Sequence, residues 1–216
     1  MNQTAGQLMH DERARFAVRG QRLEYFTIAY NSLEGLIAIA FGALAGSIAL
    51  VGFGFDSVIE VTSGAVLLWR LRAEMDERRR ERVEALSLRI VGVCFLALAI
   101  YVGYEAVVSL SRRALPERSV PGIVLAAASL VVMPLLARAK RRVARGLDSA
   151  AMSADAKQTE LCTYLSAILL GGLALNALVG WWWADPVAAL LMVPLIGVEG
   201  YRALRGERCC VQGTCH

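Results

Sequence analysis

The stretch SIALVGFGFDSVIEVTSGAVLLW, residues 47–69, decides the fold class. A helix of about 20 apolar residues crosses the hydrocarbon core of a bilayer. This stretch has that length, and its only charged residues are Asp56 and Glu60. Its apolar residues do not follow the amphipathic period of a soluble helix. The stretch therefore predicts a transmembrane helix with two carboxylates near mid-bilayer.

One further apolar block precedes it and four follow it, and short charged stretches separate most of them. We expect six spans, over residues 25–45, 47–69, 90–110, 120–137, 161–179 and 181–198. At about 20 residues each, they take more than half of a chain of 216 residues that is 56% hydrophobic. The first residues have no apolar core and no small-residue cleavage site, which is unlike a signal peptide. The sequence predicts an all-α, polytopic membrane protein.

Basic residues predict its orientation and its division along the chain. With the N-terminus inside, the inner segments hold nineteen Lys and Arg residues and the outer loops three. Because cytoplasmic loops retain positive charge, we expect both termini in the cytoplasm. We expect the protein itself in a bacterial inner (plasma) membrane. The expected parts are a cytoplasmic arm over 1–24, a six-helix transmembrane domain over 25–204 and a cytoplasmic tail over 205–216.

Two function classes are excluded at this stage. The net charge of +4 could suit nucleic acid, but the arginines cluster at the ends of apolar blocks without interleaved aromatic residues. No span contains a His, and no nucleophile with a neighbouring base is evident, so the sequence does not predict an enzyme.

Ionisable residues inside the spans are candidates for function, because an ionised group in hydrocarbon is costly. Asp56 and Glu60 are four residues apart and share one helix face. Two such carboxylates cannot both stay ionised without a cation, so either a proton or a metal ion joins them. The alternative is a protonated pair that donates hydrogen bonds to neighbouring helices.

The fifth span has a second group of polar residues with the same spacing. Gln158 and Cys162 lie four residues apart, and a thiolate at Cys162 is a soft metal ligand. The alternative is a packed apolar cysteine, as expected for Cys94. Glu34 and Asp155 are candidate pathway residues. Near the ends of spans, where water reaches, we expect a solvated or structural role for Glu105, Glu160 and Asp185.

The tail ends in a group of soft ligands, Cys209, Cys210, Cys215 and His216. Their spacing does not fit a structural zinc site. A metal-capturing arm and a plain disordered end are both consistent with it.

The two pairs with four-residue spacing resemble those of the cation diffusion facilitator (cation efflux) family, in which paired ligands on the second and fifth helices bind the metal. The resemblance covers residues 25–205 and includes ADPVAALLMVPLI, which is similar to the family's Asp-Pro start of the sixth helix. It implies export of divalent metals in exchange for protons, with Asp56, Glu60, Gln158 and Cys162 as metal ligands.

Two departures from the family pattern shape what we expect. We expect a short form without the family's usual cytoplasmic domain after the sixth helix, so its homodimer would form through the spans. Gln and Cys also stand where the family has His and Asp. We expect a transporter of zinc, cadmium or cobalt, with the metal as substrate and no prosthetic group. The alternative is a membrane metal sensor or accessory subunit that does not transport.

Overall fold

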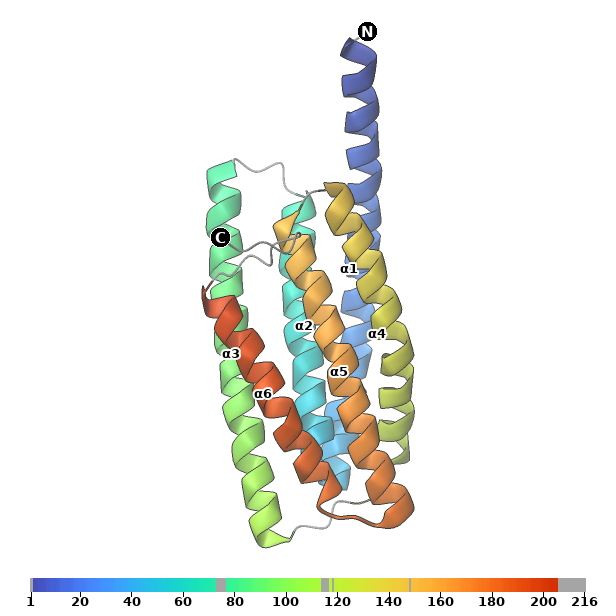
Figure 1. Cartoon of the computed structure of the whole chain (residues 1–216), viewed down its shortest axis with the longest axis vertical. Helices are drawn as coiled ribbons and strands as arrows, with labels where there is room; N and C mark the ends of the chain where they lie inside the picture. Colours follow the sequence, from blue (N-terminus) through green and yellow to red (C-terminus); the bar gives the residue numbers. More distant parts are fainter. Residues whose placement is uncertain (1, 73–76, 114–116, 118, 148, 206–216) are drawn as a thin grey trace.

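A computed structural model describes residues 2–72, 77–113, 117, 119–147 and 149–205. All six of its elements are α-helices: α1 Asn2–Ala45, α2 Ile48–Arg72, α3 Glu77–Arg112, α4 Val120–Leu147, α5 Ala150–Val179 and α6 Ala184–Arg205. They form one elongated bundle from which the first part of α1 projects (Figure 1). Each helix contains a segment long and apolar enough to cross a membrane. The predicted all-α, six-span membrane protein is confirmed.

Most of the helices extend beyond the apolar blocks that predicted them. Helix α1 runs without a break across the expected arm boundary at residue 24, and α4 continues through its basic stretch to Leu147. Long polar side chains such as Arg and Lys favour helix as well as apolar ones do. The added turns also bury apolar surface, because Phe16 of α1 packs against a small cluster that includes Val143 and Met152.

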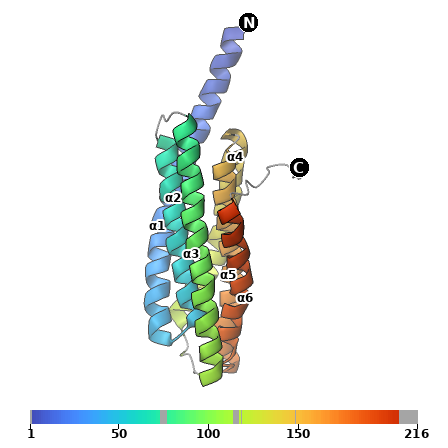
Figure 2. The same ribbon diagram turned by 90° about the vertical axis from the view of Figure 1, so that its left-hand side faces the viewer.

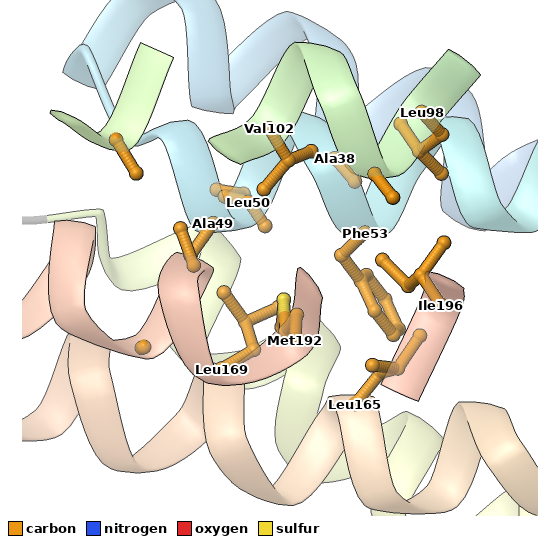
Figure 3. Packing of buried hydrophobic residues seen from close by; sticks show 14 of the residues in the cluster. Ala38, Ala49, Leu50, Phe53, Leu98, Val102, Leu165, Leu169, Met192 and Ile196 are labelled. Atoms are coloured by element: carbon orange, nitrogen blue, oxygen red, sulfur yellow. The ribbon is translucent and has the colours of Figure 1, made fainter. Parts of the chain in front are cut away.

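The main apolar core lies between α2 and its neighbours (Figure 3). Phe53 of α2 is 1% exposed and lies in one cluster with Leu165 of α5 and Ile196 of α6. A view turned by 90° shows α3 and α6 running side by side along one flank (Figure 2). This core packs around the middle of α2, where the two intramembrane carboxylates are.

Glycines allow the closest helix contacts. Gly46 has φ +65° in the tight turn between α1 and α2, a conformation that residues with a Cβ rarely adopt. At the crossing of α3 and α6, a Cβ on Gly200 would lie 2.9 Å from the Cβ of Phe95 and 3.1 Å from the carbonyl oxygen of Gly92. Small residues at such crossings let helices in a membrane approach closely.

Asp185 joins the ends of α2 and α6 at the end of the bundle opposite the projecting arm. Ser47 Oγ donates a hydrogen bond to Asp185 Oδ1, and the backbone N–H of Ile48 donates to Asp185 Oδ2 at 2.9 Å. The expectation that water reaches this carboxylate was wrong, because Asp185 is 1% exposed. Hydrogen bonds from the first turn of α2 replace the water, since the first N–H groups of a helix have no partner within it. The expected structural role fits these contacts.

Candidate metal site

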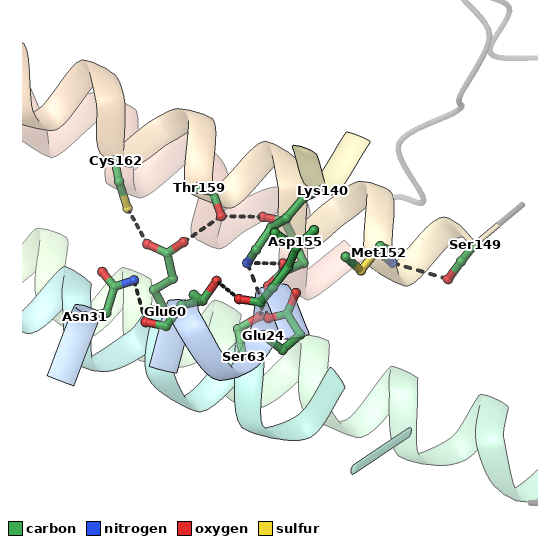
Figure 4. A network of polar contacts seen from close by, with 12 residues as sticks. Glu24, Asn31, Glu60, Ser63, Lys140, Ser149, Met152, Asp155, Thr159 and Cys162 are labelled. Carbon is green, nitrogen blue, oxygen red and sulfur yellow. Dashed lines mark hydrogen bonds and ion pairs between the residues drawn. The ribbon is translucent and has the colours of Figure 1, made fainter. Parts of the chain in front are cut away.

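Two carboxylates and a thiol meet in the interior, between α2 and α5. Asp56, Glu60 and Cys162 are each at most 1% exposed. Cys162 Sγ lies 3.0 Å from Asp56 Oδ2 and 2.9 Å from Glu60 Oε2. In Figure 4 the Cys162 side chain points from α5 toward Glu60 on α2. We call these three residues the acid–thiol cluster.

The hydrogen atoms available in this cluster do not satisfy its oxygen atoms. A thiol has one hydrogen, so Cys162 can donate fully to only one of the two carboxylates at a time. Asp56 Oδ1 is buried and has no hydrogen-bond partner among the described residues. Two buried carboxylates this close to one thiol need a shared proton or a cation. The cluster can therefore hold a positive charge that no described hydrogen bond or ion pair supplies there.

Thr159 belongs to the same site, and reasoning from the sequence missed it. Its hydroxyl lies 2.6 Å from Glu60 Oε1 and 3.2 Å from the backbone carbonyl oxygen of Asp155. The hydroxyl has one hydrogen, so if it donates to Asp155, a protonated Glu60 must donate to Thr159. A signal existed in the spacing, because Thr159 is three residues before Cys162 and shares its helix face.

Gln158 is buried, but no described contact joins its side chain to the acid–thiol cluster. It is 7% exposed, and its Nε2 has no hydrogen-bond partner among the described residues. Successive residues of a helix point about 100° apart, and the neighbouring Thr159 occupies the contact with Glu60. The proposed ligand role of Gln158 stays a prediction.

Glu34 connects α1 to α2 close to the cluster. Ser57 Oγ donates to Glu34 Oε2 at 3.0 Å, and Glu34 is 2% exposed. Asn31 does not pair with Glu34 through its amide nitrogen, which donates to the carbonyl oxygen of Thr27 at 3.0 Å. Glu34 thus fixes the first helix beside Asp56, and its pathway role stays a prediction.

Asp155 lies inside the bundle, where it is bound by a lysine. Lys140, which the charge count placed among the basic residues of the inner segments, is 0% exposed. Its Nζ forms ion pairs with Asp155 Oδ2 and, at 3.3 Å, with Glu24 Oε2. Hydropathy along single helices could not reveal this triad, because its members come from three helices. We call Glu24, Lys140 and Asp155 the ion-pair layer.

No described contact joins Glu160, Glu105 or Cys94 to the acid–thiol cluster. Glu160 forms an ion pair at 2.6 Å with Arg141, and both side chains are partly exposed, as expected near a span end. Glu105 is half-buried, and Cys94 is an exposed free thiol. The soft ligands of the tail, Cys209, Cys210, Cys215 and His216, lie outside the described residues.

The acid–thiol cluster has the right donor atoms for a metal ion, but these atoms lie closer together than the ligands of a bound metal ion would. Zinc binds sulfur at about 2.3 Å and carboxylate oxygen at about 2.1 Å, which places tetrahedral ligands roughly 3.6 Å apart. The S···O distances of 3.0 and 2.9 Å are those of hydrogen bonds. Within the described ranges, no three His, Cys, Asp or Glu side chains are arranged so that they could hold a metal ion without moving. The side chains must separate by roughly 0.6 Å before a cation fits.

Comparison with known proteins places this arrangement in a family. The cation efflux transmembrane domain matches residues 25–207. An uncharacterized transporter of Synechocystis sp. is 28% identical over 175 residues, which are 77% of this chain and 56% of that protein. Transmembrane protein 163 of Xenopus laevis is 26% identical over 155 residues, which are 71% of this chain and 54% of that protein.

A third similar protein carries a functional name. The cation-efflux pump FieF of Shewanella oneidensis is 30% identical over 125 residues, which are 56% of this chain and 40% of that protein. The chain thus spans about half the length of the first two relatives and less of the third. The domain match over residues 25–207, on six helices apolar enough to cross a membrane, shows that this chain belongs to the cation efflux family.

Proposed function

We propose that the protein exports divalent transition-metal cations from the cytoplasm, with the acid–thiol cluster as its transport site. The observation that carries this proposal is the convergence of Asp56, Glu60 and Cys162 inside an apolar bundle. Without a bound proton or metal, these groups would bring two negative charges into a medium of low dielectric constant. A divalent cation neutralises both carboxylates at once.

The donor atoms favour particular metals. A thiolate is a soft ligand, and two carboxylates are hard ones, so the cluster suits zinc, cadmium or cobalt better than magnesium, calcium or manganese. Gln158 is a further candidate ligand, one turn from Cys162, through its amide oxygen. The metal is the transported substrate, and we propose no prosthetic group.

Exchange with protons follows from the same groups. The carboxylates and the thiol must lose their protons to bind a metal, so metal binding releases protons and acid opposes binding. If release on the far side is accompanied by reprotonation, each cycle moves metal one way and protons the other. The 2.6 Å contact of Thr159 with Glu60 gives one such proton a place in the metal-free cluster.

We further propose both termini in the cytoplasm, as the basic residues indicate, and movement of the helices around a fixed site. The homodimer that the family resemblance implies would form through the spans. The outer face offers apolar side chains for this, such as Leu178 at 84% exposed, although lipid covers such side chains equally well.

The test is metal uptake by purified protein in lipid vesicles that contain a metal-sensitive dye. We expect uptake of zinc, cadmium or cobalt and at most a tenth of that rate for magnesium, calcium or manganese. Asp56→Asn is the site variant, and Arg141→Met with Glu160→Gln, which removes an exposed ion pair, is the control. Parent protein that binds zinc but never moves it would contradict export and support a sensor or accessory subunit.

A further inference from the structure

Lys140 is a cation held at 0% exposure inside the apolar bundle. Its ammonium pairs with Asp155 Oδ2 on α5 and with Glu24 Oε2 on α1. Asp155 Oδ1 accepts a hydrogen bond from Ser63 Oγ of α2 at 3.4 Å. Figure 4 shows Lys140 between the Glu24 and Asp155 carboxylates. Side chains of α1, α2, α4 and α5 are therefore tied together at one level of the bundle.

This level lies between the transport site and the end of the bundle from which α1 projects. Asp155 is one helical turn before Thr159, and Ser63 is less than a turn after Glu60. The Thr159 hydroxyl contacts both Glu60 Oε1 and the Asp155 carbonyl oxygen, so the ion-pair layer and the acid–thiol cluster are neighbours. The three residues of the layer are at most 4% exposed, so the interior is closed at this level.

The charges of the layer explain how it could open. Two buried carboxylates need a proton or a cation beside them, and removing a paired cation alone is strongly destabilising. A divalent cation that reaches this level supplies the charge that Lys140 supplies in the closed arrangement. It can therefore release the lysine without leaving the carboxylates uncompensated.

We propose that Glu24, Lys140 and Asp155 form the gate of the transport route on the side of the projecting arm, and that the passing divalent cation displaces Lys140 from the two carboxylates. The proposal rests on the proposed transport function. Lys140 acts here as a positioning residue, since its ammonium binds Asp155 and Glu24 and forms no described hydrogen bond or ion pair with the acid–thiol cluster, which it reaches only through the electrostatic attraction between its charge and Glu60. The displaced lysine would return once the cation has moved on to the cluster.

The buried Cys162 thiol is a reporter for this gate. In a background with Cys94 and the tail residues Cys209, Cys210 and Cys215 changed to Ser, only Cys162 can react with a small, charged, membrane-impermeant thiosulfonate. We compare the parent with Lys140→Met plus Glu24→Gln, which keeps the net charge and removes both ion pairs of Lys140. Arg141→Met plus Glu160→Gln is the matched control, because it removes an exposed ion pair between the same α4 and α5.

We expect the gate variant to react at least tenfold faster than the parent when the reagent is added on the arm side, and no faster when it is added on the other side. The control should react like the parent from both sides. Equal rates in gate variant and parent would overturn the proposal. Faster reaction from both sides, or a melting temperature that falls well below that of the control, would show a merely structural role and would also overturn it.

A conservative change gives a second readout, on transport itself. Lys140→Arg keeps the cation, but a guanidinium binds carboxylates through two parallel hydrogen bonds and is harder to displace. We expect Cys162 in this variant to be labelled as slowly as in the parent. We also expect the kcat for zinc transport to be several-fold lower, with KM changed less than twofold. An unchanged kcat would contradict displacement. If the parent moves no zinc but the gate variant is still labelled faster from the arm side, the transport function is rejected and the gate is retained. If the parent moves zinc but the gate variant is labelled no faster, only the gate is rejected.

Discussion

Cys162 is the residue on which the chemistry of the cluster depends most. It lies within 3.0 Å of two carboxylates that have no other thiol beside them in the described interior. As a packed apolar side chain it would fill space, whereas as a ligand it would select soft metals. The two interpretations predict different results for the same substitution.

Cys162→Ala should lower zinc and cadmium uptake at least tenfold, because it removes the soft ligand and leaves the two carboxylates. Cys162→Asp should retain transport but move the preference toward harder ions such as manganese. Cys94→Ala is the matched control, since that thiol is exposed on α3 and has no described contact with the cluster. Uptake of every metal at the parent rate by Cys162→Ala would show that the thiol is not a ligand.

Asp56 and Glu60 should each be indispensable for transport but not for folding. Asp56→Asn and Glu60→Gln keep the size of the side chain and remove its charge, so the helix becomes easier to insert in a membrane. We expect metal affinity to fall at least tenfold, which is about 1.4 kcal/mol of binding free energy. Isothermal titration with zinc measures this. Parent-like affinity in both variants would contradict the assignment of the site.

Only some residues of the candidate site could be predicted from the sequence. Asp56 and Glu60 were predictable because both stand on one helix, where spacing alone places them on one face. The pairing of α2 with α5 came from the family resemblance, and the contact with Cys162 agrees with it. Glu24 and Lys140 were not predictable as a pair, because α1 and α4 meet there only through tertiary packing.

At the scale of elements, the membrane-crossing parts were predictable and the helix ends were not. Apolar length marks where lipid surrounds a helix, but helices α1, α3, α4 and α5 continue well past those limits. These continuations matter for function, because Lys140 and Asp155 both lie beyond the spans expected at 120–137 and 161–179. Hydropathy treats them as boundary charges, whereas packing buries both.

The α3–α6 crossing offers a prediction about packing. Gly200→Leu should separate the two helices, because even a Cβ there would lie 2.9 Å from the Cβ of Phe95. We expect about 1–3 kcal/mol of destabilisation, as is typical of overpacked sites. The melting temperature of helix signal in detergent measures it. Gly171→Leu is the control, since a Cβ on Gly171 would meet nothing within 4 Å; equal melting temperatures would contradict this account of the crossing.

At the scale of the whole molecule, the outer surface is apolar, whereas the interior holds two groups of ionisable side chains besides its apolar core. Exposed side chains such as Leu36, Ile100 and Val131 suit contact with lipid. Inside, the acid–thiol cluster on α2 and α5 and the ion-pair layer on α1, α4 and α5 place ionisable groups at two neighbouring levels. Such a sequence of buried ionisable groups is typical of a route for ions rather than of a structural core.

One measurement tests the transport claim most directly: zinc and proton fluxes recorded in the same vesicles, with dyes for zinc and for pH inside. For parent protein we predict that added zinc enters while the interior loses protons. A vesicle interior more alkaline than the outside should therefore slow the entry of zinc. Asp56→Asn should show neither flux. Zinc entry at the same rate through parent and Asp56→Asn protein, or no zinc entry through the parent at all, would contradict the account.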